Sequence, residues 1–469
     1  MVRIIGIDGL DKSILERYID ELPVFKKISR EGVLSKIESV FPADSVPAWI
    51  TIFTGLNPAE HGIIRGKDYI ESVESFENKS KFKLQGKTFW DVLSEKKYKC
   101  LVINPFLAYP SWEINGIMES GPAFITGDPS LSPDDTDSLH PEVLGGYSPV
   151  AGLAGLKADM ETIFSDTLKL WEEYEYQSSR GEFDLEFVTF TTLDRLMHYT
   201  WRYNDENDPL HEKDEFLSGC TANLLKLFDR KTGELISKMN DNDFLILISD
   251  HGFRQRPFNL INLNEYLRLK GFLTFRKEVN DKKAKRLQIL KKNAITYFSK
   301  LKILDLAAKY LRNIGYFSKL KKSDYLIDKE NSICYTDEMF SGKKPYVGLN
   351  FGEKLRNAGE DEKNKAFQQV VSLLNNDDIP RPVWIKRAEE LYQGEYQLNM
   401  PDICIEFPYD NGIEFNYFGE LMEKSATHYR ISGGHFGSGT FGFYCSNKKM
   451  VNAPDSLTGF AGFVKDLFK

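Results

Sequence analysis

Short runs of apolar residues, many of them β-branched or aromatic, recur along the first half of the chain, and helical spacing fills the intervals between them. The clearest runs cover residues 2–7, 100–103, 187–190 and 244–248. Uninterrupted apolar runs of this length are typical of strands buried on both faces of a parallel sheet. Because they alternate with helical stretches such as residues 159–178, they predict an α/β fold around a mostly parallel sheet.

One segment departs from the composition of the rest. Between residues 276 and 322 there are 15 Lys or Arg residues and only three acids. Apolar residues recur there at steps of three and four over residues 287–311, which predicts an amphipathic helix with a basic outer face. The helix has two interpretations: it docks on its own protein as part of a cap, or it contacts an anionic membrane or a partner protein.

These patterns divide the 469 residues into three expected parts. Residues 1–265 form an α/β core, and residues 266–335 form an inserted basic helical cap. Residues 336–469 contain the remainder of the cap and return to the core, with a helix over 365–376 and late strands over 401–407 and 440–445. A chain of this length can bury a large core without disulfides.

Charge and cysteine content exclude several classes of protein. The formal net charge of −8 argues against a protein that binds polyanions over its whole surface. No apolar run approaches the roughly 18 residues of a membrane span. The N-terminal residues are typical of a first strand, not of a signal peptide. Five scattered cysteines without a CxxC pair favour free thiols in a reducing compartment, so we expect the cytoplasm. The sequence does not indicate an oligomeric state.

Two candidate site residues lie near the N-terminus. Asp8 follows the first apolar run and precedes Gly9, a pattern that is typical of a turn and that also delivers a carboxylate to the end of a strand. Ser45 stands before Pro47 at the start of an apolar helix, where a hydroxyl is often only an N-cap. The same place suits a nucleophile that attacks phosphate, because a helix N-terminus favours anions.

Acids and histidines at two further strand ends suggest metal ligands. Asp194 and His198 are four residues apart, which places them on one helix face, either to hold one cation or as an ordinary polar face. Asp250 and His251 follow the apolar run 244–248 directly and form a compact acid–imidazole corner.

His435 is the last candidate ligand and stands among glycines, where the alternative is a simple flexible loop. With it, the candidates form two possible ligand groups. One contains Asp8, Asp250 and His251, and the other contains Asp194, His198 and His435. Three nitrogen or oxygen ligands leave a position open, as catalytic metal sites require. Two such ions about 4 Å apart activate an oxygen nucleophile and stabilise a transferring phosphoryl group.

The ordered set of motifs resembles the alkaline phosphatase superfamily, in particular its type I phosphodiesterase/nucleotide pyrophosphatase branch. The motifs read IGIDG (5–9), FPADSVP (41–47), TGLNPAEHG (54–62), TLDRLMHYTW (192–201) and SDHGF (249–253). The resemblance is closest to a group of microbial predicted phosphohydrolases or phosphomutases and spans most of the chain. It implies a three-layer α/β/α core with a mostly parallel sheet and an inserted cap.

The resemblance also implies roles for the candidate residues. Ser45 is the expected nucleophile, and two divalent metal ions are expected, with Zn²⁺ as the first choice and Mn²⁺ as the alternative. Arg195 either reaches a phosphate or pairs with a neighbouring acid. One ion would be held by Asp8, Ser45, Asp250 and His251, and the other by Asp194, His198 and His435.

The implied reaction is hydrolysis of a small phosphate ester. A phosphodiester is the first choice, and phosphomonoester hydrolysis or phosphomutase chemistry on the same site is the alternative. A sulfatase is disfavoured, because the segment from Ser45 to Trp49 lacks the Arg of the formylglycine motif. From another class, the chain could be an inactive scaffold that meets a membrane or a partner through its basic helix.

Overall fold

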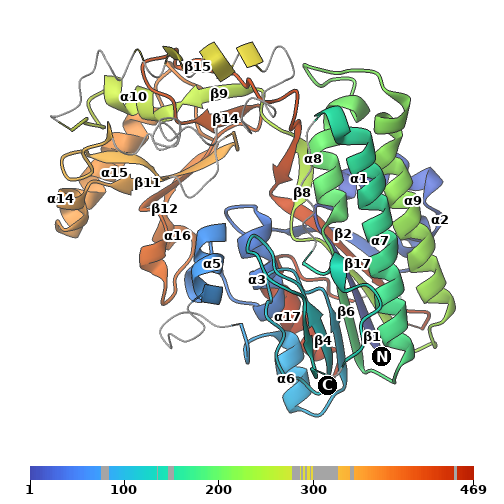
Figure 1. Ribbon diagram of the computed structural model, residues 1–469. Helices are drawn as coiled ribbons and strands as arrows, with labels where there is room; N and C mark the ends of the chain where they lie inside the picture. Colours follow the sequence, from blue (N-terminus) through green and yellow to red (C-terminus); the bar gives the residue numbers. More distant parts are fainter. Residues whose placement is uncertain are drawn as a thin grey trace. The chain divides into compact units, whose positions relative to one another are not determined.

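The computed structural model describes residues 1–74, 84–134, 136–145, 153–276, 326–337, 343–447 and 451–469, with a few positions between 286 and 298. The basic helix expected over 287–311 lies almost entirely outside the described residues. The chain divides into two units (Figure 1). The first comprises Met1–Arg254, Gly394–Tyr396 and Gly433–Lys469, and the second comprises Gln255–Gln393 and Gln397–Ser432. The boundaries expected at residues 265 and 335 stay predictions.

An eight-stranded sheet forms the centre of the first unit. Its order is β2-β17-β7-β1-β6-β3-β4-β5, and the five strands from β7 to β4 run parallel. Strand β17 is antiparallel to β7 and β2, and β5 is antiparallel to β4. The mostly parallel sheet is therefore confirmed. The bounds are β1 (Val2–Ile7), β2 (Val33–Glu38), β3 (Cys100–Ile103), β4 (Gly116–Ser120), β5 (Ser130–Ser132), β6 (Leu185–Phe190), β7 (Phe244–Ile248) and β17 (Ser438–Tyr444).

Helices cover both faces of this sheet because its strands are apolar on both sides. Val188 and Phe190 of β6 belong to a core shared with one set of helices, whereas the intervening Phe187 packs on Phe53, Phe89 and Trp90 of another set. The three-layer α/β/α core is confirmed. The first set is α1 (Lys12–Tyr18), α2 (Pro23–Glu31), α7 (Leu156–Ser179), α8 (Thr192–Asn204) and α9 (Glu215–Ser237), and the second is α3 (Ser45–Thr54), α6 (Phe89–Glu95) and α17 (Leu457–Asp466).

The second unit has a core of its own around an antiparallel sheet of order β10-β11-β13-β12, which α15 (Glu360–Leu374) covers. A three-stranded sheet of order β14-β9-β15 and α10 (Leu263–Leu269) complete it. The strands are β9 (Asn259–Asn262), β10 (Cys334–Asp337), β11 (Tyr346–Phe351), β12 (Trp384–Arg387), β13 (Ile403–Glu406), β14 (Asn411–Glu414) and β15 (Met422–Lys424). The helix and strand expected over 365–376 and 401–407 correspond to α15 and β13.

All five cysteines are free and buried, as the sequence predicts. Among the helices of the described residues, none combines the length and the apolar character needed to cross a bilayer.

Candidate active site

All seven candidate residues lie in the first unit, and five of them follow adjacent parallel strands. Asp8 follows β1, Asp250 and His251 follow β7, and Asp194 and His198 stand on α8 directly after β6. Because β7, β1 and β6 are neighbours, their carboxyl ends meet at one edge of the sheet, where α/β proteins place ligands. The first turn of α3 adds Ser45, and the short strand β16 (Gly433–Phe436) adds His435.

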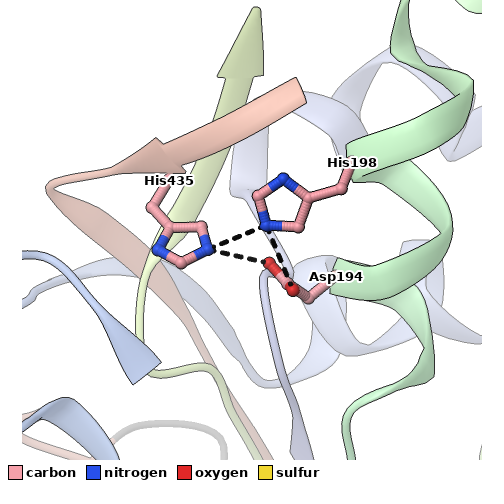
Figure 2. A group of neighbouring side chains, drawn as sticks. All are labelled: Asp194, His198 and His435. Carbon is pink, nitrogen blue, oxygen red and sulfur yellow. Dashed lines mark hydrogen bonds and ion pairs between the residues drawn. The ribbon is translucent and has the colours of Figure 1, made fainter. Parts of the chain in front are cut away.

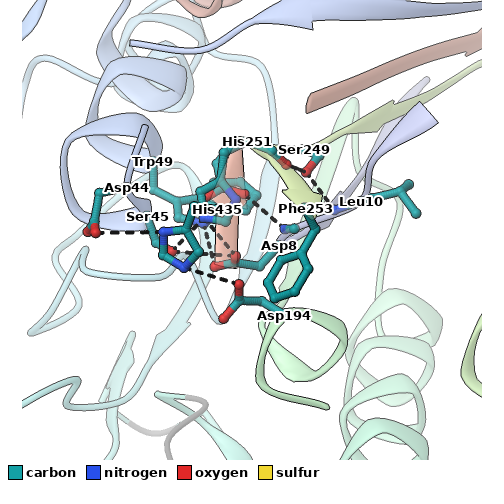
Figure 3. A network of polar contacts seen from close by, with 12 residues as sticks. Asp8, Leu10, Asp44, Ser45, Trp49, Asp194, Ser249, His251, Phe253 and His435 are labelled. Carbon is teal, nitrogen blue, oxygen red and sulfur yellow. Dashed lines mark hydrogen bonds and ion pairs between the residues drawn. The ribbon is translucent and has the colours of Figure 1, made fainter. Parts of the chain in front are cut away.

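The first ligand group converges on the imidazole of His251 (Figure 3). Its Nε2 atom lies 3.1 Å from Ser45 Oγ, 3.2 Å from Asp250 Oδ2 and 3.5 Å from Asp8 Oδ1. The Ser45 hydroxyl lies 3.4 Å from Asp8 Oδ1. Thus four groups from three separate parts of the chain surround one point.

The second group forms a triangle of three side chains (Figure 2). The Nε2 atoms of His198 and His435 are 3.0 Å apart, and they lie 3.4 Å and 3.3 Å from the two carboxylate oxygens of Asp194. The spacing of Asp194 and His198 places both on the same face of α8, as predicted. The rings of His251 and His435 stack at 3.9 Å, so the two groups adjoin.

The second group fits a divalent cation, and so does a set formed by Asp8, Asp194 and His251. The expected set of Asp8, Asp250 and His251 stays a prediction. Ligand atoms about 2.0–2.2 Å from a tetrahedral ion lie roughly 3.3–3.6 Å from one another. The separations above, 3.0 to 3.5 Å, are close to that range. Ligand atoms of Asp194, His198 and His435, and likewise of Asp8, Asp194 and His251, lie within 4.8 Å of one another. Asp250 Oδ2 is buried and makes no hydrogen bond, although it lies near His251.

The protonation of two imidazoles is set by backbone carbonyls. His198 Nδ1 lies 2.8 Å from the Gly433 carbonyl oxygen, and His251 Nδ1 lies 3.0 Å from that of Gly252. Because a carbonyl oxygen only accepts, each Nδ1 carries the hydrogen and donates it. Each Nε2 then keeps a lone pair directed into the site, which is the arrangement of metal-binding histidines.

Burial and like charge perturb the carboxyl groups. Burial raises the pKa of Asp8, and the Asp250 and Asp194 carboxylates raise it further. Burial and Asp194 likewise raise the pKa of Asp250. Burial opposes ionisation of Asp194 as well, but His198 and His435 lower its pKa below the usual value. Three buried carboxylates this close together create a strong demand for positive charge.

Neighbouring backbone and indole groups hold the first group in place. The N–H of Gly9 donates to Asp250 Oδ1 at 3.2 Å, and the indole of Trp49 donates to Asp8 Oδ2 at 3.0 Å. Gly9 adopts φ 73°, and a Cβ there would lie 3.1 Å from the Asp194 Cβ. The Asp-Gly pair therefore forms a turn and also delivers the Asp8 carboxylate to the end of β1.

The structure corrects two local interpretations and adds a residue that the sequence analysis missed. Helix α3 begins at Ser45, and its N-cap is Asp44, whose side chain accepts from the Val46 N–H. Ser45 is therefore not the cap, because Asp44 already accepts that bond. His435 lies on a strand paired with β8 (Gly252–Gln255), not in a flexible loop. Asp44 is the residue that the sequence analysis missed, and its carboxylate lies 3.7 Å from His435 Nδ1. An Asp directly before an apolar helix indicates an N-cap, so the sequence contained a signal for it.

The fold and the two ligand groups define an alkaline-phosphatase-like α/β protein with adjoining sets of side chains suited to hold cations. Structural comparison supports the fold: phosphonoacetate hydrolase of Sinorhizobium meliloti 1021, solved with phosphonoacetate, superposes with a TM-score of 0.56. That match is 13% identical and covers 100% of this chain and 95% of the hydrolase.

Sequence comparison identifies the family. The family model "Type I phosphodiesterase / nucleotide pyrophosphatase" matches residues 2–403, and the chain belongs to this family. Ectonucleotide pyrophosphatase/phosphodiesterase family member 1 of Mus musculus is 26% identical over 272 residues, and the Rattus norvegicus protein gives the same figures. The match covers 56% of this chain and 25% of each relative, so the chain spans about a quarter of the length of these curated relatives.

Proposed function

We propose that this protein hydrolyses phosphate esters, phosphodiesters first, with Ser45 as the nucleophile and two divalent cations held by the Asp/His groups. Zn²⁺ is the first choice of ion and Mn²⁺ the second, because nitrogen and oxygen ligands suit either. The observation that carries the proposal is the place of Ser45: its Oγ lies 3.1 Å from His251 Nε2 and 3.4 Å from Asp8 Oδ1. The hydroxyl is thus part of the ligand group itself.

The chain's own residues position the nucleophile. Ser45 is the first residue of α3, where backbone N–H groups favour an anion in front of the helix. Bound cations would lower the pKa of a hydroxyl or a water and stabilise charge on the phosphoryl oxygens. Ser45 Oγ loses its proton and forms a bond to phosphorus while the bond to the first alcohol oxygen breaks, and that oxygen takes up a proton and leaves as the alcohol. Water then displaces Ser45 Oγ and gives one proton to it, which restores the hydroxyl and releases the phosphorylated product.

The test combines metal analysis with two chromogenic substrates, bis-p-nitrophenyl phosphate and p-nitrophenyl phosphate. We expect bound divalent metal and faster hydrolysis of the diester. Ser45→Ala should abolish turnover while the second group, which lacks Ser45, keeps its metal. Ser29→Ala, at an exposed serine, is the matched control. Activity that survives in Ser45→Ala would remove Ser45 from the nucleophile role.

Other outcomes of the same assay identify the alternatives. Preference for the monoester would favour a phosphomonoesterase, and transfer of phosphate between positions of one sugar phosphate would favour a mutase. An inert protein without metal would favour a scaffold. For the compartment we propose the cytoplasm, which the five free and buried cysteines support; cell fractionation tests it.

We propose that the basic helix expected over residues 287–311 contacts an anionic membrane or a partner protein. Its positive charge supports this, since Lys and Arg near an anionic surface are attracted over about a Debye length. Binding of the protein to anionic vesicles should fall as salt rises. Absence of binding at low ionic strength would reject the membrane contact.

A further inference from the structure

A cavity of about 370 Å³ lies in the first unit, and its lining includes Thr192 and Arg195, which flank Asp194 on α8. Asn104, the first residue after β3, and Thr191, the first residue after β6, line it together with the start of α8. Its volume is within the range of small-molecule sites. Because β6 is the neighbour of β1, which delivers Asp8, the cavity opens at the same edge of the sheet as the ligand groups.

Helix α8 links the cavity to the ligand groups. Asp194 directs its carboxylate toward His198 and His435, and the next residue, Arg195, lines the cavity. A molecule whose phosphate lies beside Asp194 would therefore have the rest of its structure within reach of Arg195. Helix α8 therefore connects the cavity with the expected position of the substrate phosphate.

The walls of the cavity are held rigidly. The Asn104 amide donates to the Thr189 carbonyl oxygen at 2.8 Å and accepts from the Gly145 N–H at 2.6 Å, so it ties the end of β6 to a surface loop. A Cβ on Gly121 would lie 2.2 Å from the Leu144 carbonyl, which shows that two loop segments touch through their backbones. Both amide ends of Asn104 are occupied, so Asn104 shapes the cavity and does not itself select a ligand.

The selective groups are charged and hydroxyl side chains. Asp166 of α7 and Arg195, both half-buried, line the cavity together with the buried hydroxyls of Thr191 and Thr192. A third charged group, Glu142, is held by Lys169, whose Nζ lies 2.8 Å from its carboxylate. The charged side chains that line the cavity are therefore two acids and one Arg, along with neutral donors and acceptors, which gives no net preference for an anion.

None of the described residues that line the cavity is aromatic. Proteins commonly bind nucleobases by stacking them on aromatic rings, and the described part of the lining offers no such platform. A carboxylate accepts hydrogen bonds from adjacent hydroxyls, and a guanidinium and threonine hydroxyls can donate to them. These polar side chains are thus suited to hydroxyl groups, while apolar residues such as Ile125, Val143 and Leu170 line the rest of the cavity.

We propose that this cavity binds the alcohol portion of the phosphate ester, and that this portion is a polyhydroxylated, non-aromatic alcohol such as a sugar or a polyol. The proposal rests on the proposed phosphate-ester hydrolysis and adds the substrate class to it. It makes Asp166 and Arg195 specificity-determining residues, with no part in the chemical step.

Equilibrium binding tests the proposal without turnover. Glucose 1-phosphate, AMP and inorganic phosphate are titrated by calorimetry into metal-loaded protein carrying Ser45→Ala. We expect glucose 1-phosphate to bind about tenfold more tightly than phosphate, the gain of one or two hydrogen bonds, and AMP to show no such advantage. Stronger binding of AMP than of glucose 1-phosphate would overturn the proposal.

Variants then assign the effect to the cavity. Asp166→Asn should reduce the ratio of glucose 1-phosphate affinity to phosphate affinity about tenfold. The matched control is Glu161→Gln, an exposed acid on the same helix. Arg195→Lys, which keeps the charge but loses the planar fork, should also reduce the ratio, with metal content measured to confirm an intact site. An unchanged ratio in both cavity variants would overturn the proposal. If the parent protein does not hydrolyse phosphate esters but Ser45→Ala still binds glucose 1-phosphate more tightly than phosphate, only the proposed enzyme function is contradicted.

Discussion

The Nε2 atoms of His198 and His435 face each other at 3.0 Å. The Nδ1 of His198 donates to the Gly433 carbonyl, and the Nδ1 of His435 is turned toward the Asp44 carboxylate. With its hydrogen on Nδ1, His198 directs the Nε2 lone pair toward His435 across this short distance. A proton or a cation between the two nitrogens would stabilise this approach, and the nearby Asp194 carboxylate favours that positive charge.

Replacement of His435 tests this group. His435→Ala removes one of three ligands, so we expect the metal content to fall from two ions to one per chain and kcat/KM to fall at least roughly 100-fold. Elemental analysis of the purified protein measures the stoichiometry. His211→Ala, on a loop outside both groups, is the control. Two ions retained in His435→Ala would show that His435 is not a ligand.

The role of Asp44 can be separated from its role as an N-cap. Asn is as good an N-cap as Asp, so Asp44→Asn should keep α3 stable while it removes the charge that faces His435 Nδ1. We expect metal affinity to fall about 10- to 100-fold, as for other residues that orient a histidine ligand. Competition with a chromogenic chelator measures it, and the exposed Asp241→Asn is the control. Unchanged affinity would limit Asp44 to the cap.

Removal of metal should make stability depend on pH. The pKa values of Asp8 and Asp250 are raised in the folded chain, so their contribution to stability is present at low pH and is lost as the pH rises above the unfolded value of 3.8. The Tm of chelated protein should therefore be lower at pH 8 than at pH 5.5, by at least about 2 °C, and the gap to the loaded protein should widen. Thermal unfolding measures both forms.

Asp8→Asn provides the control for that effect. The amide oxygen can still accept from the Trp49 indole, but the buried charge is absent. The chelated variant should lose part of the pH dependence and should be more stable than the chelated parent at pH 8. Equal Tm values for the chelated parent at both pH values would contradict the expected repulsion.

Glu119, on β4, is a further buried acid and lies outside the ligand groups. Burial, with the nearby Glu173, raises the pKa of Glu119 to about 9, and Gln177 donates to its Oε1 at 2.6 Å. A carboxyl with a raised pKa stabilises the fold below its unfolded pKa and loses that contribution as the pH approaches 9. Glu119→Gln, which resembles the protonated acid, should raise the free energy of unfolding at pH 8 by roughly 1–3 kcal/mol and by less at pH 5.5.

Chemical denaturation at the two pH values checks this prediction, with the exposed Glu182→Gln as the matched control. Destabilisation by Glu119→Gln at pH 8 would show that the ionised carboxylate is preferred at this position.

The sequence predicts the strands of the central sheet well, because buried parallel strands are uninterrupted apolar runs. Residues 2–7, 100–103 and 244–248 coincide with β1, β3 and β7. Pro23 opens α2, and a short 3₁₀ turn, Ile19–Glu21, separates this helix from α1, in keeping with the preference of proline for the first helical position. These elements depend on local patterns, so local reasoning is sufficient.

The strand that carries His435 could not be predicted in this way. Its residues Gly433 and Gly434 have low strand propensity and resemble a loop. A Cβ on Gly433 would lie 2.3 Å from the Phe253 ring, so this glycine permits close packing against a residue 180 positions away. Its requirement is tertiary, and a single sequence contains no trace of the partner. The cavity beside Arg195 depends in the same way on loops that only the folded chain brings together.

Strand β17 lies between β7 and β2 in the sheet although it follows the whole second unit in the chain. During synthesis on the ribosome, β7 therefore emerges long before the strand that pairs with its outer edge. A nascent chain that has reached residue 432 exposes unpaired backbone groups along β7. It also lacks His435, so its second ligand group is incomplete. Completion of the second ligand group is consequently a late event in biogenesis, and a chaperone that shields open sheet edges would act in that interval.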